Sequence, residues 1–257
     1  MNRCMGLLAI AIGLALGACT GAGTPDAASN IPPAKPAGPI QKVQWRALAA
    51  AGDDSIAVFD NAVDAMTKIL TARGVTRIDR FTSDPDVAQA DRPLATADSM
   101  TAALDAAKPG PGQGCFVFLT SHGSRKGLLL RDDLDHERSL DPSTLGRMLD
   151  EGCGSAPTVA IVSGCFSGIF IGRVTEAPNR IILTAARDDR TSFGCSAEEQ
   201  YTYFDDCLFQ SWPKAQTWAG LYRATDSCVR AKENALGAVH SEPQAFFGEA
   251  VANLGLP

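Results

Sequence analysis

Two stretches decide the fold: CFVFLTSHGS at residues 115–124 and TVAIVSGCFSG at residues 158–168. Each begins with a near-continuous apolar run, which is typical of a strand buried on both faces of a sheet. Each then changes to small and polar residues, with His122 after the first run and Cys165 after the second. Because a helical pattern separates the two runs, we expect their strands to be parallel, with both ends at one edge.

The flanking sequence continues this alternation of strands and helices. Further strands are predicted at 43–51, 75–81 and 180–185, and helices at 61–73, 95–107 and 140–151. Asp141 and Pro142 fit the N-cap and first position of the last helix. The predicted fold is a three-layer α/β/α sandwich with a mainly parallel sheet, and ligands of such sheets bind at the carboxyl ends of the strands.

The pairing of His122 with Cys165 predicts nucleophilic chemistry at this edge. A cysteine can attack a carbonyl, and a nearby imidazole can take the thiol proton. The backbone N–H groups of Gly123 and Cys165 would stabilise the developing oxyanion. For an arbitrary protein, a cysteine after an apolar strand is more often a small core residue. The two similar strand ends, 43 residues apart, favour the catalytic interpretation.

Several other kinds of site are disfavoured. The segment 164–168 is not G-x-S-x-G, since Ser167 stands one position too late for a serine nucleophile. Three scattered histidines without C-x-x-C argue against zinc, and we read His136 and His240 as surface residues. We expect no metal and no organic cofactor.

Composition indicates a folded, enzyme-sized chain that does not bind nucleic acid. Of the 257 residues, 45% are hydrophobic and 20% charged, which is ordinary for a globular domain. The formal net charge is −6 and no basic run occurs, whereas nucleic-acid binding needs clustered Lys and Arg. We therefore expect no nucleic-acid partner.

The N-terminus predicts export and a lipid anchor. Residues 1–18 carry one positive charge and then an apolar run too short to span a bilayer comfortably. The segment 16–19 (LGAC) resembles a bacterial lipobox, which implies that Cys19 is lipidated and anchors the chain to the membrane; the alternative is a plain signal peptide that is cleaved near Ala18. Thr20 after the cysteine resembles outer-membrane lipoproteins, so we expect an anchor in the outer membrane of the bacterial envelope, with the domain facing the periplasm. Residues 19–40 are rich in Pro, Ala and Gly and are predicted to form a disordered tether before a single domain at 41–257.

With Cys19 lipidated and Cys165 free, five cysteines remain in the oxidising compartment. These are Cys115, Cys153, Cys195, Cys207 and Cys228. Five is odd, so at most two disulfides form. We expect the buried Cys115 to be the unpaired one, and the connectivity of the other four stays open.

The two strand ends resemble the caspase–hemoglobinase clan of cysteine peptidases, and within it the legumain-like family C13. Members of that family carry His-Gly-Ser after one strand and Cys-x-Ser-Gly after the next. Residues 182–186 (ILTAA), 192–195 (SFGC) and 203–206 (YFDD) are similar to further family motifs. The resemblance covers roughly residues 43–212 and implies a caspase-like fold.

The resemblance also implies the site residues. His122 and Cys165 form the catalytic dyad, and Gly123 completes the oxyanion hole. Ser192 and Asp206 match substrate-binding positions of the family, and Asp205 stands beside them.

The sequence departs from the family at its asparagine pocket. Eukaryotic members have an Arg-His pair where residues 58–59 read Val-Phe here, and an acidic residue where Phe166 stands. We expect Asp205 or Asp206, with no balancing Arg, to favour a basic or amide side chain. Asp60 and Asn61 are the candidates for orienting His122.

The predicted function is hydrolysis of peptide bonds by Cys165 and His122 through an acyl-enzyme. Two alternatives stay open. One is a transamidase or ligase of the same clan, in which an amine intercepts the acyl-enzyme. The other is a non-catalytic envelope binding module that retains the fold. The expected partner is a protein or peptide substrate.

Overall fold

A six-stranded sheet forms the middle layer of the protein. The computed structural model describes residues 31–33, 38–131 and 137–257. The strand order is β2-β1-β3-β7-β8-β9, in which the first five strands are parallel and β9 is antiparallel to β8. The strands are β1 (Gln44–Ala51), β2 (Arg77–Phe81), β3 (Gln113–Thr120), β7 (Thr158–Ser163), β8 (Arg180–Thr184) and β9 (Gln244–Phe247).

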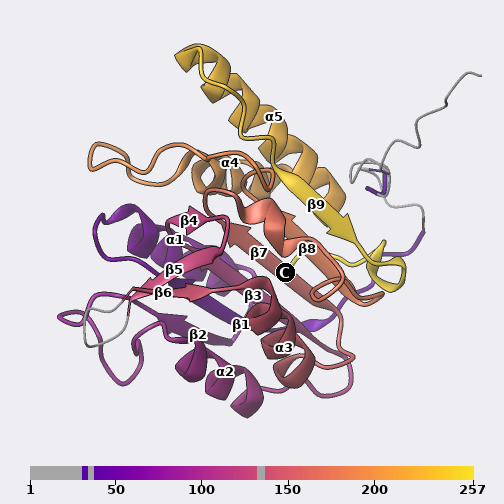
Figure 1. The fold of residues 1–257 in the computed structure, drawn as a ribbon. Coiled ribbons are helices and arrows are strands. Elements are labelled where there is room, and N and C mark those ends of the chain that lie inside the picture. The colour runs from indigo at the N-terminus through magenta and orange to yellow at the C-terminus, as the bar shows by residue number, and fades with distance from the viewer. Residues whose placement is uncertain (1–30, 34–37, 132–136) are drawn as a thin grey trace, which may run out of the picture.

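Helices cover both faces of this sheet (Figure 1). One face carries α1 (Val58–Ala72), α4 (Tyr203–Ser211) and α5 (Trp218–Leu236), and the other carries α2 (Ala97–Ala106) and α3 (Pro142–Gly152). Within the described ranges, no helix combines the length and apolar character needed to cross a membrane.

The sheet is buried on both faces, as its apolar runs predicted. Along β3, Phe116 and Phe118 pack into the hydrophobic cluster under α1, α4 and α5, whereas Val117 and Leu119 pack under α2 and α3. All four side chains are at most 2% exposed. This alternation confirms the predicted three-layer α/β/α sandwich.

A second, smaller sheet follows His122 directly and was not predicted. It consists of β4 (Gly123–Ser124), β5 (Gly127–Arg131) and β6 (Glu137–Leu140), paired antiparallel. Leu128 and Leu130 of β5 are buried in the cluster below α2 and α3. A two-residue strand such as β4 is too short to show a periodic pattern, which is why the sequence did not indicate it.

The predicted start of α3 is confirmed, and α1 begins earlier than predicted. The Asp141 carboxylate accepts hydrogen bonds from the backbone N–H groups of Ser143 and Thr144, and Pro142 is the first residue of α3. α1 starts at Val58 rather than at residue 61, which brings Phe59 into its first turn.

The described part of the chain contains two disulfides, and the expectation that Cys115 stays unpaired is wrong. Cys115 bonds to Cys153 and Cys207 to Cys228, leaving Cys165 and Cys195 as the free cysteines there. Cys115 lies near the start of β3, 5.6 Å (Cα–Cα) from Cys153 at the end of α3. A buried strand position does not prevent pairing when a helix end lies against it.

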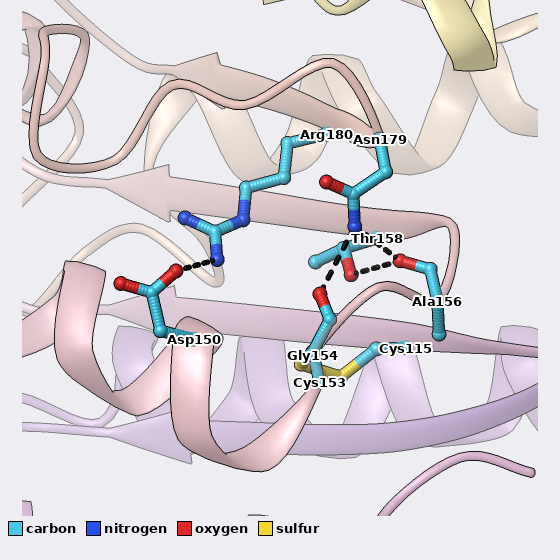
Figure 2. The surroundings of a disulfide bond; sticks show 8 residues. All are labelled: Cys115, Asp150, Cys153, Gly154, Ala156, Thr158, Asn179 and Arg180. Carbon is cyan, nitrogen blue, oxygen red and sulfur yellow. Dashed lines mark hydrogen bonds and ion pairs between the residues drawn. A yellow bond between two sulfur atoms is a disulfide. The ribbon is translucent and has the colours of Figure 1, made fainter.

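The turn after α3 is fixed by further contacts around this disulfide (Figure 2). Asn179 donates hydrogen bonds to the carbonyls of Gly154 and Ala156, at 3.1 and 2.7 Å. Arg180 forms an ion pair with Asp150 of α3 at 2.6 Å. These contacts join α3 to the start of β8.

Part of the predicted tether contacts the folded domain. Arg223 of α5 donates hydrogen bonds to the carbonyls of Pro32 and Ile31, at 2.5 and 3.2 Å. The Ile31 side chain packs against the larger hydrophobic cluster. Cys19, the predicted lipidation site, lies outside the described residues.

Candidate active site

The loops that follow β3 and β7 lie against each other at the carboxyl edge of the sheet. Thr120 pairs with Ser163 at the end of the ladder, and the Ser121 N–H donates to the Ser163 carbonyl at 3.0 Å. Two residues beyond Ser121 and Ser163 the backbones are closer still, because a Cβ on Gly123 would lie 2.1 Å from the Cys165 carbonyl oxygen. Only glycine permits this approach. His122 and Cys165 therefore emerge from two loops in direct contact.

The backbone around Cys165 leaves a donor for an incoming oxygen. Phe166 adopts a left-handed conformation, with φ 59°, and its N–H donates to the Arg190 carbonyl at 2.7 Å. The Cys165 N–H donates to no group within the described part of the chain. A free N–H beside a nucleophile is the donor that an oxyanion needs.

Ser192 contacts the Cys165 sulfur from the loop after β8. Its backbone N–H donates to Cys165 Sγ at 3.3 Å, and its Oγ and carbonyl oxygen lie 3.6 and 3.7 Å from the same atom. An N–H that donates to sulfur stabilises negative charge there. Ser192 thus lies against the Cys165 sulfur, and its role in substrate binding stays a prediction.

His122 is contacted by a ring rather than by a hydrogen-bonding group. Its imidazole meets the Phe59 ring edge to face, with 5.1 Å between centroids and 81° between planes. Asp60 pairs instead with Arg92 at 2.5 Å and accepts from Thr82. Asn61 donates to the Gln200 carbonyl. Neither of the two residues expected to orient His122 bonds to it.

Asp205 is a fully buried acid under β3 and β7. It is 0% exposed, so its carboxylate does not line an open substrate pocket. Its Oδ2 accepts from Thr120 Oγ1, the last residue of β3, at 2.9 Å, while its Oδ1 has no hydrogen-bond partner. Burial raises the pKa of Asp205 to about 6, against the opposing effect of the hydrogen bond from Thr120.

Asp206 points to a different neighbour, although it is the next residue of α4. Its carboxylate forms an ion pair with Lys232 of α5 at 2.6 Å and accepts from Gln210 at 2.8 Å. Lys232 also lies over the Tyr203 ring, 4.8 Å from its centroid. The balancing cation that the sequence analysis did not find is therefore Lys232, 26 positions along the chain.

Cys195 is the second free thiol near this edge, and its environment makes it unreactive. Burial raises the pKa of the Cys195 thiol to about 12. A thiol with this pKa stays protonated at neutral pH and is a poor nucleophile. Cys165 is consequently the candidate nucleophile of the pair.

A cavity of about 390 Å³ opens beside His122, on the side of the small sheet. Its lining residues are His122, Gly123, Ser124, Lys126, Gly127, Leu129, Arg138 and Ser139. Arg125 lies between two lining residues in the sequence, and its guanidinium carbon lies over the Phe166 ring, 5.3 Å from the ring centroid. A larger cavity, of about 620 Å³, lies by the start of β1 at the opposite edge of the sheet and includes neither His122 nor Cys165.

No group of His, Cys, Asp and Glu side chains suited to a metal ion occurs among the described residues. At the edge that carries His122 and Cys165, the described residues offer a thiol, an imidazole and backbone donors.

Comparison with known proteins identifies both a family and a fold. The model of the peptidase C13 family matches residues 96–225, which is about half of the chain and includes His122, Cys165 and Asp206. The crystal structure of caspase-1 from Spodoptera frugiperda is similar, with a TM-score of 0.55 and 13% sequence identity over 81% of this chain and 88% of that chain. At this identity the likeness concerns the fold. No curated protein matches the sequence.

Proposed function

Since the chain belongs to the peptidase C13 family and has a caspase-like fold, we propose that it is a cysteine peptidase with Cys165 as nucleophile and His122 as general base. The observation that carries this proposal is the contact between the two strand-end loops, in which Gly123 packs on the Cys165 backbone. That contact brings a thiol, an imidazole and a free backbone N–H to one edge.

The proposed reaction uses only these groups. His122 takes the thiol proton, and the Cys165 sulfur attacks the peptide carbonyl carbon. The carbonyl oxygen becomes an oxyanion that accepts hydrogen bonds from the backbone N–H groups of Cys165 and Gly123. His122 then gives its proton to the leaving amine, and the C–N bond breaks. Water, deprotonated by His122, cleaves the thioester and regenerates the thiol.

Ser192, Asp205 and Asp206 were predicted together as substrate-binding residues, but their side chains lie in different surroundings. Ser192 touches the sulfur and faces the scissile bond in this proposal. Asp205 lies below the strands and supports them, and Asp206 contributes a carboxylate already paired with Lys232. A basic or amide side chain at the scissile bond would have to compete with Lys232 for Asp206. A peptide library that varies this position tests the preference directly.

A transamidase or ligase would use the same intermediate, with an amine in place of water. The two activities are separated by supplying a peptide substrate with and without an amine nucleophile and identifying the products by mass. Membrane attachment through Cys19 in the bacterial envelope is a further proposal, which rests on residues 16–19 of the sequence. Labelling with a radioactive fatty acid, lost on Cys19→Ser, tests it.

The decisive experiment measures covalent labelling by a peptide acyloxymethylketone. The purified protein is incubated with the probe, and the modified residue is identified by peptide mapping. We expect one label at Cys165, abolished by Cys165→Ala and strongly slowed by His122→Ala. Cys195→Ala is the matched control, because it removes the neighbouring free thiol and should leave the label in place. Absence of label together with Cys165 in a disulfide would reject the peptidase and favour the binding module.

A further inference from the structure

The contact between Phe59 and His122 is the most specific interaction of the His122 ring. The centroids are 5.1 Å apart at an interplanar angle of 81°, which is the edge-to-face geometry favoured by aromatic quadrupoles. Phe59 lies in the first turn of α1 and is 0% exposed. It is therefore held by the core on every other side, and its ring offers His122 a fixed surface.

The ring nitrogens of His122 have no hydrogen-bond partner in the ranges that the structure describes. The backbone of His122 is fixed, since its carbonyl accepts from the Leu129 N–H at 2.8 Å. The ring torsion of histidine is broad and roughly two-fold, so a fixed backbone alone does not determine which nitrogen faces Cys165. An orienting group is needed, and Asp60 and Asn61 are engaged elsewhere.

We infer that Phe59 is the positioning residue of His122, replacing the hydrogen-bonded side chain that usually orients a catalytic imidazole. This inference rests on the proposed function, in which His122 moves the proton of Cys165. Phe59 touches neither substrate nor sulfur in this account. It restricts the imidazole to the orientation from which proton transfer occurs, and it leaves both ring nitrogens free to exchange protons.

The predicted consequence is a loss of rate without a loss of substrate binding. An aromatic pair of this geometry biases a population by roughly two- to tenfold beyond simple burial. In Phe59→Leu we expect kcat to fall by a factor in this range while KM stays unchanged. Met66→Ala, two turns further along α1 and equally buried, is the control for general weakening of the helix. It should lower the unfolding temperature and leave kcat as in the wild type.

A double-mutant cycle separates positioning from a structural effect. The rate constant for alkylation of Cys165 by iodoacetamide at pH 7 is measured in the wild type, Phe59→Leu, His122→Ala and the double variant. If Phe59 acts through His122, Phe59→Leu slows alkylation in the wild-type background and has no further effect in His122→Ala. An equal slowing in both backgrounds, or no slowing in either, would overturn the inference.

Two outcomes keep this test distinct from that of the proposed function. If the wild type does not react faster than His122→Ala, the dyad itself is refuted. If the wild type does react faster and Phe59→Leu matches it, only the role of Phe59 fails. Should Phe59→Leu not fold, nuclear Overhauser effects between the Phe59 and His122 ring protons of the wild type decide. Their presence from pH 5 to 8 supports positioning, and their absence contradicts it.

Discussion

Replacing Asp205 by asparagine should remove a pH-dependent loss of stability. Burial raises the pKa of Asp205 from 3.8 to about 6 in the folded protein, so the folded state holds a proton that the unfolded state releases. Stability contributed by the neutral carboxyl is present below about pH 4 and is lost as pH rises through about 6. At 1.36 kcal/mol for each pH unit, this loss amounts to about 3 kcal/mol.

Asparagine is neutral at every pH and has the shape of the protonated acid. Asp205→Asn should therefore lack the decline between pH 4 and pH 6.5, and it should be more stable than the wild type at pH 7 by up to about 3 kcal/mol. Urea unfolding of both proteins at half-unit intervals of pH measures the difference. The amide oxygen can still accept from Thr120, which preserves the hydrogen bond to β3.

Asp206→Asn is the matched control for this experiment. Its carboxylate is partly exposed and paired with Lys232, and loss of such a pair costs about 1 kcal/mol or less. The control should retain the decline in stability between pH 4 and pH 6.5. Parallel curves for Asp205→Asn and the wild type would show that Asp205 titrates normally and that the argument from burial is wrong.

Three further variants test the site and its support. Gly123→Ala should slow labelling of Cys165 by the acyloxymethylketone at least about 100-fold, because the added Cβ would lie 2.1 Å from the Cys165 carbonyl oxygen. Labelling at the wild-type rate would contradict the close contact. Ser192→Ala keeps the backbone N–H that donates to Cys165 Sγ, so we expect less than about a threefold change in labelling rate. A larger fall would show that the Ser192 hydroxyl takes part in the reaction. Replacing Cys115 and Cys153 together by serine should lower the free energy of unfolding, measured by urea unfolding, by about 4 kcal/mol, because the disulfide closes a loop with a sequence separation of 38 residues. An unchanged value would show that the disulfide does not constrain the unfolded chain.

Local sequence patterns predicted most of the sandwich. The apolar runs gave the central strands, and the Asp141 cap with Pro142 gave the start of α3. β4, β6 and β9 were missed because strands of two to four residues carry too little periodicity to stand out. The disulfide partner of Cys115 was missed for a different reason: it depends on where the end of α3 lies against β3, which no local pattern records.

The residues of the candidate site were likewise predictable only where a local sequence pattern marks them. The position of His122 and Cys165 at one edge of the sheet could be predicted because each follows a recognisable buried strand, whereas their catalytic roles stay predictions. Phe59 could not be predicted, since a phenylalanine on the apolar face of a helix has the same pattern whether it packs on core or on an imidazole. Asp205 and Asp206 were indistinguishable in sequence, whereas on α4 successive residues differ in direction by about 100°. One consequently faces the sheet and the other faces α5.

The placement of the disulfides determines what a break in the chain would do. The two disulfides of the described region lie on opposite sides of Cys165 in the sequence: Cys115–Cys153 lies wholly before it and Cys207–Cys228 wholly after it. A protease cut anywhere from residue 154 to 206 therefore produces two fragments that no disulfide of this region connects. Such a nicked protein would be held together by its sheet and core alone. It would separate into the same two bands on a denaturing gel with or without reducing agent.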